Sequence, residues 1–447
     1  MPDKYANQKK DPELRSYVVD FLQAFKAAAA VSGKDLPRIF DTGRFNIFPG
    51  GAVEFTEDVT ATLRNIGLRA AKLLGSKAGN EKALRQIALK QAQGFLVNNT
   101  AIDTSTNSLI DKLFDEGSAQ FDFLVPNRLI LFQEGVRAIR IGRVRAMMTD
   151  DFEAELAKIP NRKLRVVADK DFSIDFALPV STVRMHPVCW VVSVDAAKDN
   201  VDEEAKWLID IAVGFLRLHY TVESARFPRY GMVEPHPIRP KDVQNVGVKV
   251  SGTSIFVGGG SVPPAYEVGK AVEAFTMDTA FIKKARLIFD PPDKSLAERV
   301  GQGLGWLTRG RQAEDRAERL LYFFTAIESL LSSDDKSAPV TQNIARHAGV
   351  ILSENNADRA KIAAEIRRFY NFRSSLVHAG NRGVLWSSAD TTQYLAESMF
   401  WVVLDKCDLS SQHRKFIDEL AQASYGLPWP DTGTAAAPPE TTDDKQT

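Results

Sequence analysis

Cysteine is scarce in this chain of 447 residues: Cys189 and Cys407 are too few for a disulfide framework. Two free thiols are typical of a reducing compartment, and we expect a cytoplasmic protein. No uninterrupted apolar run approaches the ~20 residues that a membrane-spanning helix needs. The N-terminal stretch 1–10 is polar and lacks the apolar core of a signal peptide. We therefore expect neither secretion nor a membrane anchor.

An excess of one charge is also missing, because 57 Lys and Arg residues balance 57 Asp and Glu residues. A chain with zero net charge has no general attraction for nucleic acid, which argues against a high-affinity, non-specific DNA or RNA binder. A nuclease with a local basic groove remains compatible with this balance. Apolar residues make up 44% and charged residues 26%, as is ordinary for soluble globular proteins.

Motifs for metal or nucleotide binding are weak. His186 and Cys189 have the spacing of two metal ligands, yet a structural zinc site needs four, so we expect Cys189 in the core. His236 lies between two prolines and is expected in an exposed loop. The glycines from Gly301 to Gly305 lack a preceding strand and a Gly-Lys-Ser/Thr sequence, so we expect a loose turn there. We predict no metal and no cofactor.

The hydrophobic periodicity changes along the chain and predicts a multidomain protein. An α+β region of unknown role is expected over 1–290, with helical patterns over 1–118 and a sheet over 119–290. A linker at Asp290-Pro-Pro-Asp293 is followed by an all-α bundle over 291–430. The tail over 431–447 is rich in Thr, Ala, Pro and Asp, and is expected to be disordered.

The bundle is expected to contain five helices. Ser387 and Asp390 have the spacing of a capping box that opens one of them. The predicted helices lie near 312–332, 340–353, 358–379, 388–406 and 411–424.

The helix predicted over 358–379 carries unusual polar groups. Arg373 falls within its apolar stripe and needs a partner, because an unpaired buried charge costs several kcal/mol. His378 lies in the last turn, where the negative end of the helix favours a protonated imidazole, and Gly380 ends the helix. The apolar stripe consists of Ile362, Ile366, Phe369, Leu376 and Val377.

Glu328 lies on the apolar side of the preceding long helix, four residues after Phe324 and three before Leu331. Two opposite charges on facing apolar stripes are less costly as a pair than as two separate charges. We therefore predict that Glu328 contacts Arg373 or shares its pocket.

The segments Arg319–Leu331 and Phe372–Gly380 together resemble the HEPN superfamily, in particular the Apea-like HEPN domains of bacteria, over roughly residues 300–425. The resemblance implies a small helical bundle, and many such domains are metal-independent endoribonucleases with an Arg-x4–6-His motif. Arg373 and His378 match the two motif positions, and Ser374 stands where the family often has Asn, Asp or His.

The resemblance also implies a symmetric homodimer that brings two motifs together. In this family, accessory regions commonly regulate or target the nuclease in phage defence or toxin–antitoxin settings. The resemblance therefore implies an RNA substrate and a regulatory protein or phage-derived trigger as partners.

The leading interpretation is an endoribonuclease with Arg373 and His378 as catalytic residues and Glu328 and Ser374 in support. Histidine can transfer protons near neutral pH, and arginine can stabilise the phosphorane. One alternative is a non-catalytic HEPN-type interaction module, with the function carried by the N-terminal region. Another is an enzyme of unknown class housed in the α+β region. RNA cleavage with and without EDTA separates the endoribonuclease from the non-catalytic interaction module.

A local basic ribbon is predicted on strands in the α+β region. Apolar residues alternate with its arginines, so one interpretation is a solvated sheet face. The other is a contact surface for RNA phosphates or an acidic partner, although without interleaved aromatic residues it is no base-stacking platform. The ribbon consists of Arg137, Arg140, Arg143 and Arg145.

Overall fold

The chain is mostly helical in this computed structural model, with an α+β region followed by a helical region. It divides into two compact units. The first contains Met1–Leu124 and Val191–Trp207, and the second contains Val125–Trp190 and Leu208–Thr447. The structure describes residues 5–29, 45–48, 51–75, 81–117, 119–169, 173–175, 181–196, 200–219, 233–239, 247–251, 253–258, 265–333 and 340–430. The tail predicted to be disordered, 431–447, lies outside the described residues.

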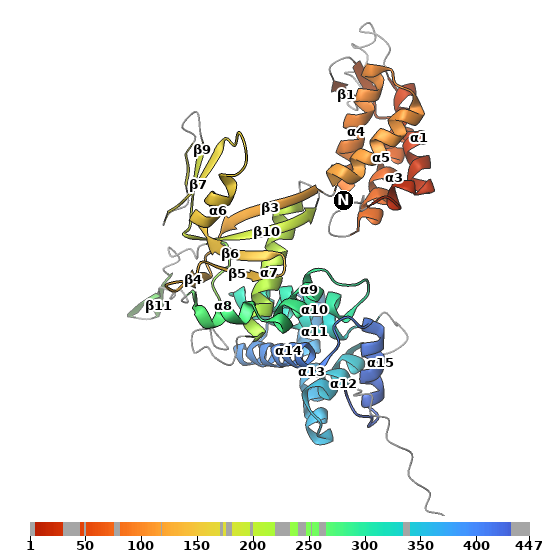
Figure 1. The fold of residues 1–447 in the computed structure, drawn as a ribbon. Coiled ribbons are helices and arrows are strands. Elements are labelled where there is room, and N and C mark those ends of the chain that lie inside the picture. The colour runs from red at the N-terminus through yellow and green to blue at the C-terminus, as the bar shows by residue number, and fades with distance from the viewer. Residues whose placement is uncertain are drawn as a thin grey trace, which may run out of the picture. The chain divides into compact units, whose positions relative to one another are not determined.

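The first unit is built on a helical bundle (Figure 1). Its described elements before residue 118 are η1 (Gln8–Lys10), α1 (Pro12–Ala27), β1 (Phe45–Phe48), β2 (Gly51–Glu54), α3 (Glu57–Leu74), α4 (Glu81–Asn98) and α5 (Ile102–Gly117). α1 and α4 each pack against both α3 and α5, which closes the bundle around a core that includes Phe21, Phe25 and Phe114. α1 begins after Asp11, whose carboxylate accepts a hydrogen bond from the Leu14 N–H at 2.8 Å.

The strands form several small sheets. They are β3 (Ala119–Pro126), β4 (Ile130–Phe132), β5 (Ala138–Ile141), β6 (Val144–Met148), β7 (Leu164–Ala168), β8 (Ser173–Asp175), β9 (Ser181–Met185), β10 (Val188–Ala196), β11 (Gly247–Ser251), β12 (Ser254–Gly258) and β13 (Tyr266–Val268). The four-stranded sheet has the order β3–β10–β6–β5. β9 lies between β7, which is parallel to it, and β8, which is antiparallel. β4 pairs in parallel with β13, and β11 and β12 form a hairpin.

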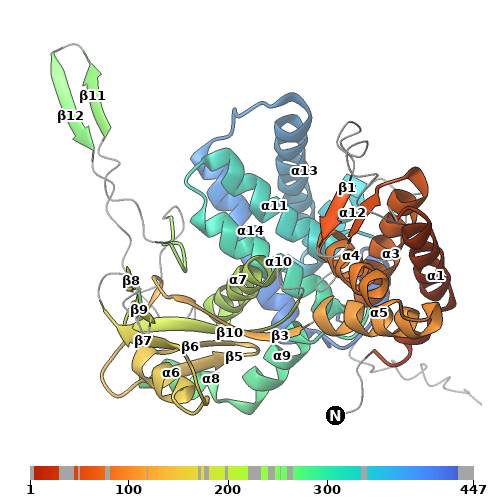
Figure 2. The same ribbon diagram turned by 90° about the horizontal axis from the view of Figure 1, so that it is seen from above.

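The second unit contains the C-terminal helices. The helices after β6 are α6 (Thr149–Leu156), α7 (Val201–His219), α8 (Lys270–Thr276), α9 (Thr279–Phe289), α10 (Leu296–Gln312), α11 (Arg316–Leu331), α12 (Val340–Leu352), α13 (Asn356–Ala379), α14 (Trp386–Lys406) and α15 (His413–Ala423). α11 and α14 lie side by side (Figure 2). α12 packs against α13. The five helices predicted beyond residue 312 are therefore confirmed as α11 to α15.

β5 and β6 form a hairpin, because Gly142 turns the chain with φ of 59°. α8 and α9 are separate helices, because Asp278 caps α9 by accepting hydrogen bonds from the N–H groups of Ala280 and Phe281. The capping box at Ser387 does not form, since α14 begins at Trp386.

The glycine-rich stretch expected as a loose turn is the interior of α10. A Cβ added to Gly303 would overlap the ring of Phe400 on α14, and one added to Gly310 would lie 2.8 Å from the Phe323 ring on α11. Because these glycines have no side chains, α10 can pack closely against α11 and α14. This packing outweighs the low helix propensity of glycine.

The expected linker at Asp290–Asp293 is a short turn between α9 and α10, which pack against each other. The boundary predicted between 290 and 291 lies inside the second unit, so helices and sheet strands share one compact body there. Among the described helices, none combines the length and the apolar character needed to cross a lipid bilayer.

Candidate active site

Two helices of the second unit, α11 and α13, carry the predicted motif residues. Each begins with a capping side chain: Asp315 for α11 and Asn355 for α13. α13 ends as predicted at Gly380, which has φ of 64°. The rings of Phe324 on α11 and Tyr370 on α13 meet edge to face with centroids 5.7 Å apart. Both helices therefore have defined ends and a direct packing contact close to the motif.

The guanidinium of Arg373 is held by Glu328. Its Nη2 donates a hydrogen bond of 3.0 Å to Oε2 of Glu328, and the two side chains are 24% and 19% exposed. The predicted contact between these residues is confirmed. The Nε of Arg373 is also buried and has no hydrogen-bond acceptor within the part of the chain that the structure describes. Glu328 therefore fixes one edge of the guanidinium, and the side chain of Arg373 remains partly exposed.

Desolvation dominates the electrostatics of this pair. Burial raises the pKa of the Glu328 carboxyl above its usual value, although the charge and hydrogen bond of Arg373 act in the opposite direction. Removal of the guanidinium would leave a largely buried carboxylate without its counter-ion. The carboxylate and the guanidinium therefore depend on each other.

His378 lies in the last turn of α13 and is exposed, and Ser374 is half-buried. His378 follows Arg373 by five residues, which is a rotation of about 140° around an α-helix. Arg373 faces α11, so the imidazole points to a different side of the helix. The two residues therefore leave α13 on different sides of the helix.

Apolar side chains are exposed around the end of α13. Val377 is 49%, Leu385 69% and Trp386 41% exposed. The prediction that Val377 belongs to the buried stripe was wrong, because that stripe ends near Phe369, where α11 and α12 pack, and the last turn extends beyond it. Further along α14, Tyr394 is also exposed. Val377 precedes His378 directly, and exposed apolar side chains of this kind are suited to protein contact.

The basic ribbon is largely neutralised by acidic partners. The contacts are Arg137 with Asp151 (2.6 Å), Arg143 with Asp290, Arg145 with Glu155 (3.0 Å), and Arg140 with the carbonyl of Gly142 (3.1 Å). Three of these four arginines thus already have carboxylate partners. The arrangement agrees with a solvated sheet face and gives no support to a phosphate-binding surface.

The other predicted candidates lie apart from the motif. Cys189 is buried in the core as expected, and burial raises the pKa of its thiol to about 11. His186 is half-buried, with Nδ1 near the backbone of Val188. His236 is half-buried rather than exposed, because its Nδ1 accepts from two backbone N–H groups of its own loop. Among the described residues, no three His, Cys, Asp or Glu side chains are grouped as a metal site.

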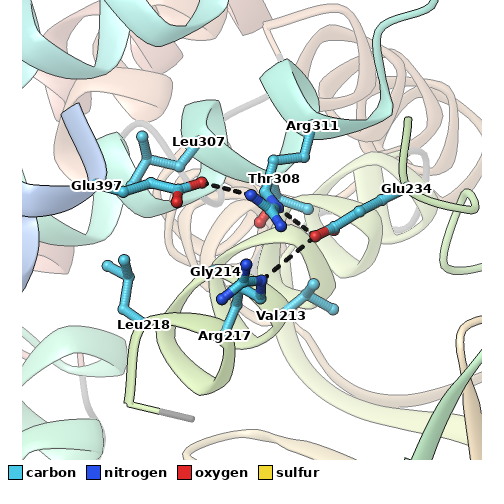
Figure 3. Close-up of a pocket in the computed structure, with 9 residues that line it drawn as sticks. All are labelled: Val213, Gly214, Arg217, Leu218, Glu234, Leu307, Thr308, Arg311 and Glu397. Atoms are coloured by element: carbon cyan, nitrogen blue, oxygen red, sulfur yellow. Dashed lines mark hydrogen bonds and ion pairs between the residues drawn. The ribbon is translucent and has the colours of Figure 1, made fainter. Parts of the chain in front are cut away.

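A buried charge network was not predicted from the sequence. Arg217, Glu234, Arg311 and Glu397 line a cavity of about 10 Å³ in the second unit (Figure 3). Arg311 pairs with Glu234 and, at 2.8 Å, with Glu397, while Arg217 lies 3.6 Å from Glu234. The four residues come from distant parts of the chain, and the local pattern around each of them gave no signal of their meeting.

Protein-family models, curated proteins and solved structures yielded no match to this chain. The chemistry of the site is therefore inferred from its own groups. It offers a fixed cation, which can bind phosphate or carboxylate, and an exposed imidazole, which can accept and donate protons.

Proposed function

We propose that the C-terminal helical region is a HEPN-like domain that acts as a metal-independent endoribonuclease, with Arg373 and His378 as catalytic residues. The contact of 3.0 Å between Arg373 and Glu328 carries this proposal, because it presents a fixed cation near an exposed histidine. We further propose a cytoplasmic toxin or phage-defence effector that responds to a regulatory protein or phage-derived trigger.

RNA supplies its own nucleophile, the ribose 2′-hydroxyl. Its oxygen attacks phosphorus while the bond to the 5′-oxygen breaks, so the products are a 2′,3′-cyclic phosphate and a 5′-hydroxyl. One imidazole removes the 2′ proton and another protonates the leaving 5′-oxygen. Arg373 stabilises the charge on the phosphorane, since its fork matches phosphate oxygens and stays charged. Glu328 acts as a positioning residue for Arg373.

A homodimer supplies the second imidazole. Each motif contains one histidine, which leaves the helix on a different side from the arginine of the same helix. In a C2 dimer the same patch faces its copy, so that each His378 can approach the partner's motif. Val377, which is exposed next to His378 in the last turn of α13, would be covered by such an interface.

A second candidate function is a non-catalytic interaction module. Its support is the burial of the contact between Arg373 and Glu328, which is equally suited to a structural ion pair. In that case region 1–290 carries the function, and the exposed surface at the end of α13 binds a partner.

The experiment that separates the two candidates is incubation of the purified chain with mixed RNAs, with and without EDTA. The 5′-hydroxyl ends are then ligated and sequenced. An endoribonuclease of the proposed kind produces new 5′-hydroxyl ends that EDTA does not suppress. An interaction module leaves the RNA intact, and cleavage that requires added metal would contradict the proposed mechanism.

A further inference from the structure

An irregular segment of the second unit, residues 233–239, is fixed at two places, and we call it the strap. The backbone carbonyl of Pro237 accepts hydrogen bonds from the Arg128 N–H at 2.8 Å and from Nε1 of Trp190 at 3.0 Å. The N–H of Glu234 donates to the carbonyl of Arg311 at 2.9 Å, near the end of α10. The strap therefore joins residues next to the sheet to the helical bundle.

The Glu234 side chain enters the buried charge network (Figure 3). It is 3% exposed and lies between Arg311, which is 2% exposed, and Arg217. Arg311 also donates from Nη1 to Glu397 at 2.8 Å. The strap is thus anchored by a carboxylate that two buried guanidinium groups share.

The network extends from Arg311 to α11. Arg319, in the first turns of α11, donates to the carbonyl of Arg311 at 3.2 Å and to the side chain of Gln393. Its Nε also lies 3.8 Å from a carboxylate oxygen of Asp390. Three arginines and three acidic residues therefore balance: Arg217, Arg311 and Arg319 against Glu234, Glu397 and Asp390. Withdrawal of Glu234 leaves one uncompensated positive charge in a buried place, which is strongly unfavourable.

α11 connects this network to the motif. Arg319 and Glu328 lie nine residues apart on α11, which is about 14 Å along one rigid helix. Glu328 holds Arg373 at 3.0 Å. A displacement of α11 at the Arg319 end is therefore transmitted to the residue that positions Arg373.

We propose that the strap is a conformational latch for the helical bundle. With Glu234 in place, α10, α11 and α14 are locked and Arg373 remains paired with Glu328. When the strap leaves, the unbalanced charge loosens α11 and frees the end of α13. This gives the second unit an internal control point, whether or not the motif cleaves RNA.

Hydrogen exchange measured by mass spectrometry on the full chain tests the latch. Glu234→Gln removes the charge and keeps the shape, and Glu267→Gln is the matched control because that carboxylate is exposed on β13. Glu234→Gln should accelerate exchange at least tenfold in peptides over 316–331 and 365–379, while Glu267→Gln should match the wild type.

The double variant Glu234→Gln/Arg217→Gln restores the charge balance of the network. Its exchange should return to within threefold of the wild type in the same peptides. Faster exchange confined to the strap in Glu234→Gln would overturn the coupling. If Glu234→Gln does not fold, the double variant decides: a folded protein with wild-type exchange supports the latch, and renewed failure to fold or fast exchange overturns it.

Discussion

Arg373 of α13 and Glu328 of α11 are joined by a hydrogen bond of 3.0 Å, and both side chains are largely buried. The guanidinium is consequently held before any ligand binds. In a catalytic site this limits the reorganisation needed to meet a phosphate, and in a structural role it ties two helices together. Substitutions of Glu328 distinguish these roles, since they alter the position of Arg373 without removing its charge.

Glu328→Gln should lower RNA cleavage by roughly tenfold to hundredfold, because a slightly displaced guanidinium stabilises the transition state poorly. Glutamine can still accept from Arg373, so the fold should be kept. Glu328→Ala should cost about 1–3 kcal/mol of unfolding free energy, since it leaves a buried donor unsatisfied. Cleavage assays and urea denaturation measure the two effects. Wild-type cleavage by Glu328→Ala would exclude the positioning role.

The same pair predicts a dependence of stability on pH. The raised pKa of Glu328 means that the folded chain binds this proton more tightly than the unfolded chain. The stability contributed by Glu328 is therefore fully present below its ordinary pKa and is lost as the pH rises through the raised value. The unfolding free energies of Glu328→Gln and the wild type should be compared by urea denaturation at pH 4 and pH 7.5. Glu328→Gln should lack the loss of unfolding free energy that the wild type shows between these pH values.

His347 of α12 should make the protein sensitive to acid. It is 3% exposed, and burial lowers its pKa from 6.5 to about 4. Between these values the unfolded chain binds a proton that the folded chain does not, so stability is present above pH 6.5 and falls as the pH approaches 4. The loss should reach roughly 3 kcal/mol. Urea denaturation of His347→Gln should show a smaller loss of unfolding free energy between pH 6.5 and pH 4 than the wild type shows. An unchanged loss would contradict the lowered pKa of His347.

Gly303 should be intolerant of a side chain. A Cβ at this position overlaps the Phe400 ring, so Gly303→Ala should destabilise the second unit by about 1–3 kcal/mol or more. Gly94→Ala is the matched control, because Gly94 lies within α4 and has open space around its Cβ position. Thermal or urea denaturation should show no loss for Gly94→Ala, since alanine favours the helix. Equal losses in both variants would refute the packing explanation.

The sequence predicted the helices of the bundle because their signals are local. Apolar spacing and the terminal Gly380 were enough to locate α13, and the inward positions of Glu328 and Arg373 were enough to predict their contact. α10 was missed because its glycines are typical of a turn, and their packing against Phe400 comes from a helix distant in sequence. Such contacts have no local pattern.

The network around Glu234 and Arg311 escaped prediction for the same reason. Its members come from α7, the strap, α10 and α14, and each one alone resembles an ordinary surface charge. Val377 was likewise predicted to be buried, although the last turn of α13 extends beyond the helices that cover its middle. Burial at a helix end depends on where neighbouring helices stop.

The exposed apolar surface predicts dimerisation. Light scattering should show a dimer at micromolar concentration, and Val377→Ser should raise its dissociation constant at least tenfold, because Val377 is 49% exposed next to His378. Val97→Ser is the matched control, since Val97 is 55% exposed on α4 of the first unit. A fully active monomer, or equal weakening by both variants, would contradict an interface at the end of α13.

The proposed active site is tested most directly by the initial rate of RNA cleavage in EDTA. This rate is measured for the wild type, His378→Ala and Arg373→Ala. Arg367→Ala is the control, because it removes an exposed arginine from the same helix. The cleavage rates of both motif variants should fall by at least a hundredfold, which is the range expected for loss of acid–base or electrostatic catalysis. Arg367→Ala should keep the wild-type rate. Full cleavage by either motif variant would contradict the proposed active site.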